Sequence, residues 1–245
     1  MFDLRIQPGQ ASFVLNETDA YREFAPPAYL RDSIACFWMR RGDGGTVRVL
    51  PDACSDLVWR SGIGAMLAGP DTGPAFSLTQ AGQLIIGARF LPGAGGPALG
   101  LPLEEVRDHR IPLADLGLDP RDQLAGDLEP LDALAAMRAV AARMATAGGP
   151  DRAVQAGAVR LLDPGQRVDR LAADLGLSER QLRRRFRAAV GYGPKTLQRV
   201  LRLRRFLRGD RADLGRAALD AGYADQSHLT RECRRLTGLS PTRLG

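Results

Sequence analysis

One short pattern occurs twice in the last third of the chain, between residues 168 and 243. The first copy covers residues 171–194 and the second covers residues 217–241. The same spacing recurs at matched positions, which are Leu182, Phe186, Gly191 and Pro194 in the first copy and Leu229, Cys233, Gly238 and Pro241 in the second. An internal duplication of this kind indicates one supersecondary unit built twice. Any fold of this chain must therefore contain two equivalent small units.

Each copy has the pattern of a helix, a tight turn and a second helix. Apolar or small residues at helical spacing predict a short first helix with one buried stripe, at positions 171, 172 and 175 and again at 217, 218 and 221. Gly176 and Gly222 follow, where a positive φ would end that helix. We expect Ser178, with Gln181 as its capping-box partner, and Asp225 to cap the second helices. This is the plan of a DNA-binding helix-turn-helix, whose second helix enters the major groove.

A helix predicted from Pro194 to residue 207 joins the two units, and the second unit contains the segment 222–241, GYADQSHLTRECRRLTGLSP. In these features the last third of the chain resembles the DNA-binding domain of AraC-type bacterial transcriptional regulators. The resemblance implies a cytoplasmic transcription factor that recognises specific DNA sequences. Leu229 and Cys233 stand where that family usually places aromatic residues. Both are apolar, so we expect the fold to be retained with a looser core in the second unit.

The candidate DNA-reading residues are those that face outward near the start of the second helices. Arginine can donate two hydrogen bonds to guanine and glutamine can pair with adenine, whereas Arg187, further round the first helix, suits a phosphate. The predicted DNA-binding residues are Arg180, Gln181, Arg183, Arg184 and Arg187 in the first unit, and Gln226, Ser227, His228, Thr230 and Arg231 in the second. The alternative is a solvated basic face, which would not explain the duplicated turn.

The joining helix determines how far apart the two units lie. At ~1.5 Å per residue it spans ~21 Å, and the second helices of the units could then lie ~34 Å apart, one turn of DNA. A single chain would thus read two adjacent major grooves of double-stranded DNA. Phosphate contacts, which make affinity fall steeply with salt, are expected from arginines of the joining helix: Arg199, Arg202, Arg204, Arg205 or Arg208.

Charge is distributed unevenly along the chain. Residues 151–245 hold 21 Lys and Arg against 10 Asp and Glu, whereas residues 1–150 hold 13 against 18. A basic part beside an acidic one is typical of a nucleic-acid-binding module attached to another domain. The segment 145–151, ATAGGPD, has the composition of a linker. We therefore predict two domains, 1–148 and 149–245.

The first domain is expected to be β-rich. Short apolar or alternating runs lie between turn-forming residues without regular βαβ alternation, which indicates a barrel or a sandwich. The runs are residues 33–40, 46–50, 55–60 and 83–91. AraC-type regulators often carry a cupin-like sensor barrel here. The segments that resemble an N-terminal domain found in a subset of these regulators are 49–59, 68–74 and 85–108.

Helices are expected between the β-rich part and the linker. Residues 113–128 predict one or two short helices, and residues 131–145 predict a longer one that either covers the barrel or supplies a dimer interface. The predicted fold class is α+β, a β-rich barrel or sandwich with trailing helices followed by an all-α domain of two helix-turn-helix units.

A group of aromatic and polar residues in the first domain is the candidate effector pocket. Its members are Trp38, Asp52, Cys54, Trp59 and Arg89. For the aromatic residues, a place in the hydrophobic core is the alternative. Asp52, Cys54 and Asp56 alternate along an expected strand, so they could point to one side, with Cys36 nearby. This group lacks a histidine, and buried cysteines are usually structural, so no metal site and no cofactor are predicted.

Catalytic and membrane signals are weak. The chain has two histidines, and the glycine-rich segment 87–96 lacks the Gly-Lys-Ser/Thr ending of a phosphate-binding loop. No apolar run approaches the ~18 residues of a membrane span, and the first ten residues lack the pattern of a secretory signal. The wide spacing of the three cysteines fits no disulfide framework. A cytoplasmic protein that is not an enzyme is therefore expected.

The sequence predicts a DNA-binding transcriptional regulator that a small-molecule effector controls through the N-terminal domain. One alternative is a thiol- or metal-responsive sensor, or a DNA-targeted enzyme, that uses Cys36 or Cys54. Another is a ligand-free regulator whose N-terminal domain only dimerises. The expected partners are double-stranded DNA, a small-molecule effector and RNA polymerase, with no membrane, and the chain would act as a homodimer or a monomer.

Overall fold

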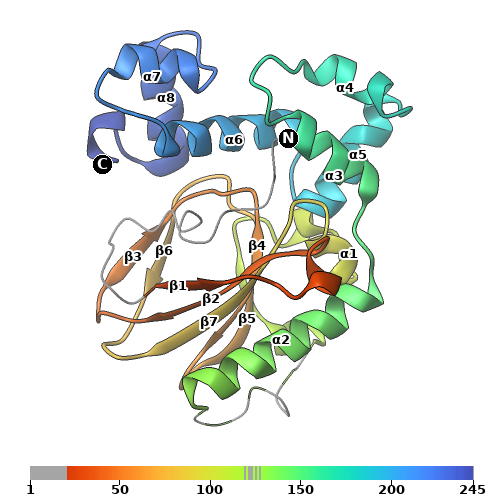
Figure 1. Ribbon diagram of the computed structural model, residues 1–245, viewed down its shortest axis with the longest axis vertical. Coiled ribbons are helices and arrows are strands. Elements are labelled where there is room, and N and C mark those ends of the chain that lie inside the picture. The colour runs from red at the N-terminus through yellow and green to blue at the C-terminus, as the bar shows by residue number, and fades with distance from the viewer. Residues whose placement is uncertain (1–20, 119, 121–123, 125, 127, 245) are drawn as a thin grey trace.

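The computed structural model describes residues 21–118, 120, 124, 126 and 128–244 (Figure 1). An N-terminal β-rich part and a C-terminal helical part lie against each other, with the joining helix α6 (Pro194–Arg208) running over one end of the sheet. The predicted architecture of a β-rich part followed by helix-turn-helix units is confirmed. Residues 1–20, in which no secretory signal is expected, lie outside the described residues.

The N-terminal part is built on an antiparallel six-stranded sheet in the order β1-β2-β7-β4-β5-β8, and β3 and β6 pair as a separate two-stranded sheet. The strands are β1 (Arg22–Phe24), β2 (Ile34–Arg41), β3 (Thr46–Val49), β4 (Ser55–Arg60), β5 (Gly64–Ala68), β6 (Ala75–Leu78), β7 (Leu84–Phe90) and β8 (Arg110–Pro112). The four runs expected from sequence correspond to β2, β3, β4 and β7. They include the three longest strands, β2, β7 and β4.

The central strand β7 is buried at every residue, because both faces of the sheet are covered. Successive side chains of a strand point to opposite faces. Ile86, Ala88 and Phe90 therefore lie in one hydrophobic core, whereas Ile85 and Arg89 face the other side. This alternation places a charged arginine inside the protein.

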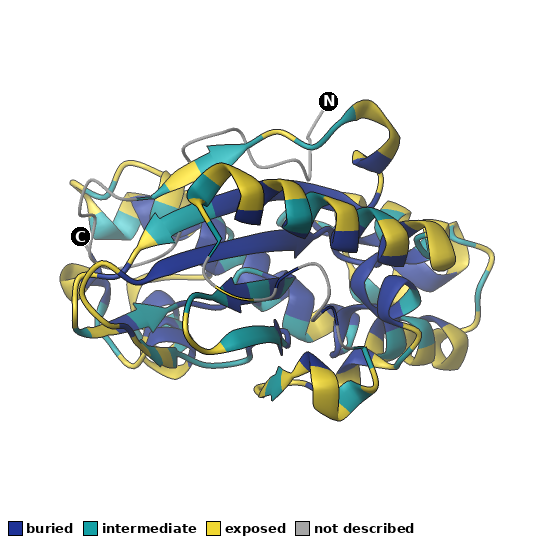
Figure 2. Ribbon diagram, turned by 90° about the horizontal axis from the view of Figure 1, so that it is seen from below, coloured by how far each residue is buried: buried dark blue, intermediate teal, exposed yellow. Residues whose placement is uncertain are grey.

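Helix α2 (Pro130–Ala147) covers the first face of the sheet (Figures 1 and 2). Its buried side is a stripe at helical spacing that joins the sheet core, made of Ala133, Leu134, Met137, Val140, Ala141 and Met144. The helix expected at residues 131–145 thus packs on the sheet of its own domain. The outer side of α2 is exposed, and its exposed residues are the yellow segments of this helix ribbon in Figure 2.

Short helical turns complete the N-terminal part. They are the 3₁₀ turns η1 (Ala28–Leu30), η2 (Leu103–Glu105) and η3 (Leu113–Leu116), and the helix α1 (Gly95–Leu99). Turn η3 is one of the short helices expected between residues 113 and 128. Residues 119, 121–123, 125 and 127 of that segment lie outside the described residues.

The C-terminal part consists of the two predicted helix-turn-helix units, the joining helix and one preceding helix. The helices are α3 (Arg152–Arg160), α4 (Val168–Asp174), α5 (Glu179–Val190), α6, α7 (Leu214–Asp220) and α8 (Gln226–Thr237), followed by the 3₁₀ turn η4 (Pro241–Arg243). Helices α4 and α5 form the first unit, and α7 and α8 form the second. None of the helices in the described part of the chain has the length and apolar character that a membrane crossing requires.

The predicted caps and turns are present in both units. The Ser178 hydroxyl accepts a hydrogen bond from the Gln181 backbone N–H, and the Gln181 side chain accepts one from the Ser178 N–H. The Asp225 carboxylate caps α8 by accepting from the His228 N–H. Gly176 and Gly222 have φ values of 66° and 88°, which a residue with a side chain rarely adopts. These local preferences explain why the sequence pattern alone located both units.

One continuous core holds the helical part together. Leu182 and Phe186 from α5 pack in it with Leu229 and Cys233 from α8, and Cys233 is fully buried. Cysteine behaves here as a small apolar side chain. The expectation that Cys233 remains a core residue is therefore confirmed.

The connection between the two parts is short and packed. Residues 148–151 separate α2 from α3, and a Cβ at Gly148 would lie 1.8 Å from the Pro97 carbonyl oxygen. The Asp151 N–H donates to the Gly93 carbonyl, 2.9 Å away. The segment expected to be a linker is therefore held against the N-terminal part, while the domain division at residue 148 stays a prediction.

Candidate nucleic-acid interface

Helix α5, the second helix of the first unit and its candidate recognition helix, exposes the residues predicted to read DNA. Leu182 and Phe186 are buried, while the outward side chains lie in solvent: Arg180, Gln181, Arg183, Arg184 and Arg187. Arg183 also reaches Glu179 at 3.2 Å, but both side chains are more than half exposed, so this pair restrains Arg183 little. The face is thus basic and accessible.

Arg185 has a different role from its neighbours on α5. Its guanidinium makes two hydrogen bonds of 2.7 and 2.8 Å to the Asp151 carboxylate, which also caps α3. These hydrogen bonds raise the pKa of Arg185 above its ordinary value. Arg185 therefore ties the first unit to α3 and is unavailable for a contact with DNA phosphate.

The second recognition helix, α8, exposes Gln226, Ser227 and Arg231, while His228 and Thr230 are half-buried. His228 Nδ1 accepts a hydrogen bond from the Ala224 N–H at 3.2 Å, which leaves Nε2 as the protonated nitrogen. The ring also meets Tyr223 edge to face, with 5.4 Å between ring centroids. His228 thus stabilises the turn as well as facing the surface.

Several arginines of the joining helix α6 have partners within the protein, although the sequence predicts that they contact phosphate. Arg204 is buried and donates from Nη1 to the Asp52 carbonyl at 3.0 Å, so it faces the N-terminal part. Arg202 and Arg205 donate to the carbonyls of Pro164 and Leu162, in the loop before α4. The expectation of a phosphate contact at Arg204 is wrong, because a helix pattern cannot show that another domain covers the charged side.

Arg199 is also engaged, in a bidentate ion pair with Glu232 of α8. Its Nε and Nη2 atoms lie 2.5 and 2.9 Å from the two Glu232 carboxylate oxygens. Burial opposes the charge of Glu232, but the hydrogen bonds and charge of Arg199 outweigh it and lower the pKa of this carboxyl. The pair locks the second recognition helix to the joining helix.

A groove of about 610 Å³ lies between the two units. Its lining comes from residues 164–169, which lead into α4, and from α6 and α8. Lys195, Arg199 and Arg202 line it together with His228 and Glu232. The basic lining continues the charge of the recognition helices across the middle of the C-terminal part.

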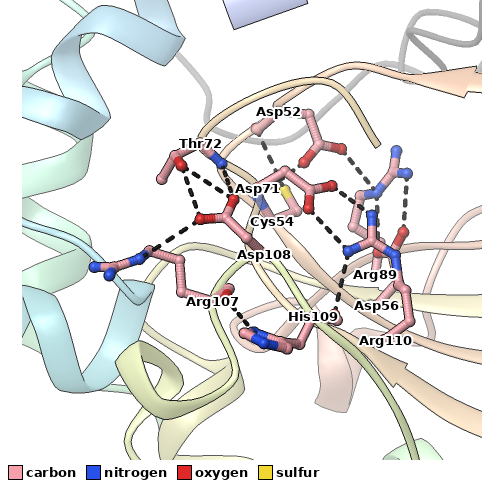
Figure 3. Close-up of polar contacts among 10 residues, drawn as sticks. All are labelled: Asp52, Cys54, Asp56, Asp71, Thr72, Arg89, Arg107, Asp108, His109 and Arg110. Atoms are coloured by element: carbon pink, nitrogen blue, oxygen red, sulfur yellow. Dashed lines mark hydrogen bonds and ion pairs between the residues drawn. The ribbon is translucent and has the colours of Figure 1, made fainter. Parts of the chain in front are cut away.

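A buried charge cluster occupies the second face of the sheet (Figure 3). Arg89 Nε lies 3.3 Å from the Asp52 carboxylate, and its Nη2 lies 3.1 Å from the Asp56 carboxylate. Burial opposes the charge, but Asp56 and Asp52 raise the pKa of Arg89 well above its ordinary value, so the guanidinium stays charged. Arg110 makes a similar pair with Asp71, at 2.6 Å.

The structure brings together only part of the predicted effector pocket. Trp38, Asp52, Cys54 and Arg89 lie on the second side of the sheet. Trp59 points into the opposite core, where its Nε1 donates to the Leu124 carbonyl at 3.0 Å. Trp59 is therefore separated from the group, and its placement matches the alternative of a core residue.

Asp52 and Cys54 reach the cluster through a turn instead of a strand. Strand β4 begins at Ser55, and Ala53 has a φ of 71°, which reverses the chain locally. The Asp52 carboxylate accepts from the Cys54 N–H at 2.9 Å and also faces Arg89. Of the three alternating residues in the sequence, only Asp56 lies on the strand.

The buried cysteines do not have the character of reactive thiols. Burial raises the pKa of Cys36 to about 12 and that of Cys54 well above its ordinary value. A thiolate is the reactive form of cysteine, so both groups are poorly nucleophilic near neutral pH. Among the described residues, no group of three or more His, Cys, Asp or Glu side chains is arranged to hold a metal ion.

The contact between the loop of the charge cluster and the helical part is not predictable from local sequence patterns. Leu50 and Ala53, from the loop before β4, are buried in the core of the helical part. The same loop carries the Asp52 carbonyl that accepts from Arg204. The only sequence signal was that Leu50 extends the apolar run of β3 beyond the strand.

Two parts of the chain match known domain families. Residues 171–244 match a helix-turn-helix domain, and residues 22–112 match a domain of unknown function, DUF6597. Among solved structures, the chain is similar to ToxT from Vibrio cholerae O395, with 8% identity over 92% of this chain and 97% of that chain and a TM-score of 0.45. A second structure of Vibrio cholerae ToxT has 9% identity, the same coverage and a TM-score of 0.46. No curated protein matches the chain.

Proposed function

We propose that this chain, an AraC-type helix-turn-helix protein with an N-terminal DUF6597 domain, is a transcriptional regulator that binds specific sequences of double-stranded DNA. The observation that carries the proposal is the pair of equivalent, correctly capped units, each with an exposed polar face at the start of its second helix. A solvated basic surface would need neither the duplication nor the caps.

In this proposal, the outward-facing residues of α5 and α8 recognise the bases. Arg180 and Arg184 can each donate two hydrogen bonds to guanine, and Gln226 can pair with adenine. Arg187 and Lys195, an exposed cation that lines the groove between the units, suit the phosphate backbone. One chain carries both recognition helices, so a monomer suffices to reach two adjacent major grooves, and a homodimer would double the number of half-sites. RNA polymerase is the partner through which such a regulator would act.

A small-molecule effector would control the regulator through the N-terminal part. The support for this is the buried cluster around Arg89, which shares the loop 50–54 with the core of the helical part. A ligand that binds one arrangement of this loop better than another would shift the population of DNA-binding arrangements.

The DNA-binding proposal is tested by fluorescence anisotropy with a labelled duplex from upstream of the gene for this protein. Wild type is compared with the double variant Arg184→Ala/Arg231→Ala at two salt concentrations. We expect tight, sequence-selective binding that weakens with salt. Each lost bidentate contact costs about 1–3 kcal/mol, so the double variant should bind at least tenfold more weakly.

The control is Arg31→Ala/Arg41→Ala, which also removes two positive charges, from exposed positions on the N-terminal part. Equal binding of random duplexes by wild type, with no response to the double substitution, would refute the proposed function. In that case the basic face would be a solvated surface only.

A further inference from the structure

The first recognition helix is packed firmly against the N-terminal part. Helix α5 contacts α1 and η2. A Cβ at Gly96 would lie 2.4 Å from the Ala188 carbonyl oxygen, and a Cβ at Gly191 would lie 2.3 Å from Pro70 Cγ. Close backbone approach of this kind leaves the first unit little freedom to move relative to the N-terminal part.

The second recognition helix meets the N-terminal part at its C-terminal end, through Arg48 of β3. The Arg48 Nη1 donates to the Thr237 carbonyl at 2.8 Å and would lie 3.1 Å from a Cβ at Gly238. The guanidinium lies over the Phe76 ring, 4.7 Å from its centroid, which holds it in place. A cation at this end of a helix is also favoured by the helix dipole.

Both contacts fall on the same position of the duplicated unit. Gly191 and Gly238 are the glycines that end α5 and α8, with φ values of 88° and 73°. Pro70 packs on the first, and Pro74 lies 3.7 Å from the Cβ position of the second. One short segment between β5 and β6 therefore reaches the ends of both recognition helices.

We propose that Arg48 is a positioning residue, which fixes the second recognition helix relative to the first and so sets the half-site spacing that the protein accepts. The first unit is held by close packing, and the second is braced to α6 by Arg199 and Glu232. The contact of Arg48 with Thr237 ties the C-terminal end of α8 directly to the N-terminal part. This inference rests on the proposed DNA-binding function.

The test measures spacing discrimination with the full-length protein. A duplex is first selected by wild type from a random-sequence pool, and its two half-sites are then moved apart or together by one base pair. One base pair rotates a half-site by about a tenth of a turn, because a turn holds about 10–10.5 base pairs. The readout is the ratio of affinities for the selected and the shifted duplexes.

The variants are Arg48→Ala, Arg48→Lys and, as a matched loss of charge, Arg41→Ala. We expect Arg48→Ala to reduce the affinity ratio by about tenfold, the change that corresponds to one charge-assisted hydrogen bond. Arg48→Lys keeps a cationic donor near Thr237 and should recover most of the ratio. Arg41→Ala should discriminate as wild type does.

Two results would overturn the inference while leaving the proposed function intact. In the first, Arg48→Ala keeps the spacing ratio of wild type. In the second, it weakens binding to every duplex by the same factor, which a general loss of positive charge would also produce. If wild type enriches no sequence from the pool, the proposed function itself fails, and the inference fails with it.

Discussion

Ala53 holds a left-handed backbone conformation, with a φ of 71°, in the loop between β3 and β4. Such a conformation costs a residue with a side chain about 1–2 kcal/mol. Contacts on both sides hold this backbone conformation. The Ala53 methyl group is buried in the helical core, and the neighbouring Asp52 carboxylate faces Arg89. The Asp52 carbonyl points the other way, to Arg204. This one residue therefore lies where the charge cluster and the helical part meet.

Also at the scale of single residues, the burial of the three cysteines predicts that their thiols react slowly with thiol reagents. Cys36, Cys54 and Cys233 are buried, and burial raises the pKa of Cys36 and of Cys233 to about 12. Near pH 8 the thiolate fraction of such groups is very small, and a thiol reagent also needs access. We expect a coloured disulfide reagent to label native protein at least tenfold more slowly than protein in denaturant.

The Cys36→Ser/Cys54→Ser double variant completes this test. Under the proposed function, its DNA binding should respond to an oxidant as wild type does, because the thiols have no regulatory role. Fast labelling of one native thiol, or loss of an oxidant response in the double variant, would favour the thiol-sensor alternative.

At the scale of elements, the ion pair between α6 and α8 predicts a pH-dependent contribution to stability. The ordinary pKa of a glutamate side chain is 4.5, and in the folded protein the pKa of Glu232 lies below this value. A lowered pKa means that the contribution is fully present above the ordinary value and is lost as the pH falls through the folded value. Glu232→Gln should therefore destabilise the protein by about 1–3 kcal/mol at neutral pH. The difference from wild type should shrink in acid.

Urea unfolding at neutral pH and at about pH 3.5 measures this difference, because the other carboxyls titrate alike in both proteins. The control is Glu179→Gln, since the pair of Glu179 with Arg183 is exposed and is worth little. A constant difference between wild type and Glu232→Gln at both pH values would contradict the assignment of the shift to this pair.

The sequence predicts the helices of the C-terminal part better than it predicts the short strands of the N-terminal part. The helix-turn-helix units were predictable because glycines, caps and core positions act locally and agree with one another. Strands β5 and β6 are short and contain glycine, alanine and serine, so their sequences carry little β preference. The roles of Arg204 and Asp52 depend on contacts between distant segments, which no local pattern contains. The same holds for Trp59, whose side of the sheet depends on the register of β4.

At the scale of the whole molecule, the two parts are joined by more than the chain. Leu50, from the N-terminal part, is buried in the core of the helical part, and Arg204 reaches back to Asp52. The short connection at residues 148–151 is packed as well. An effector that alters the N-terminal part would therefore act on the recognition helices through shared packing, which has discrete arrangements.

This shared core predicts that the molecule unfolds as one cooperative unit, in a single calorimetric transition. Leu50→Ala removes a buried side chain at the junction, at a cost of about 2–5 kcal/mol, and should separate the unfolding of the helical part from that of the sheet. Leu67→Ala makes the same deletion inside the sheet core and should lower the melting temperature while keeping one transition. Two transitions in wild type would show that the parts fold independently. Any effector signal would then have to pass through surface contacts such as that of Arg48, and not through the core that Leu50 completes.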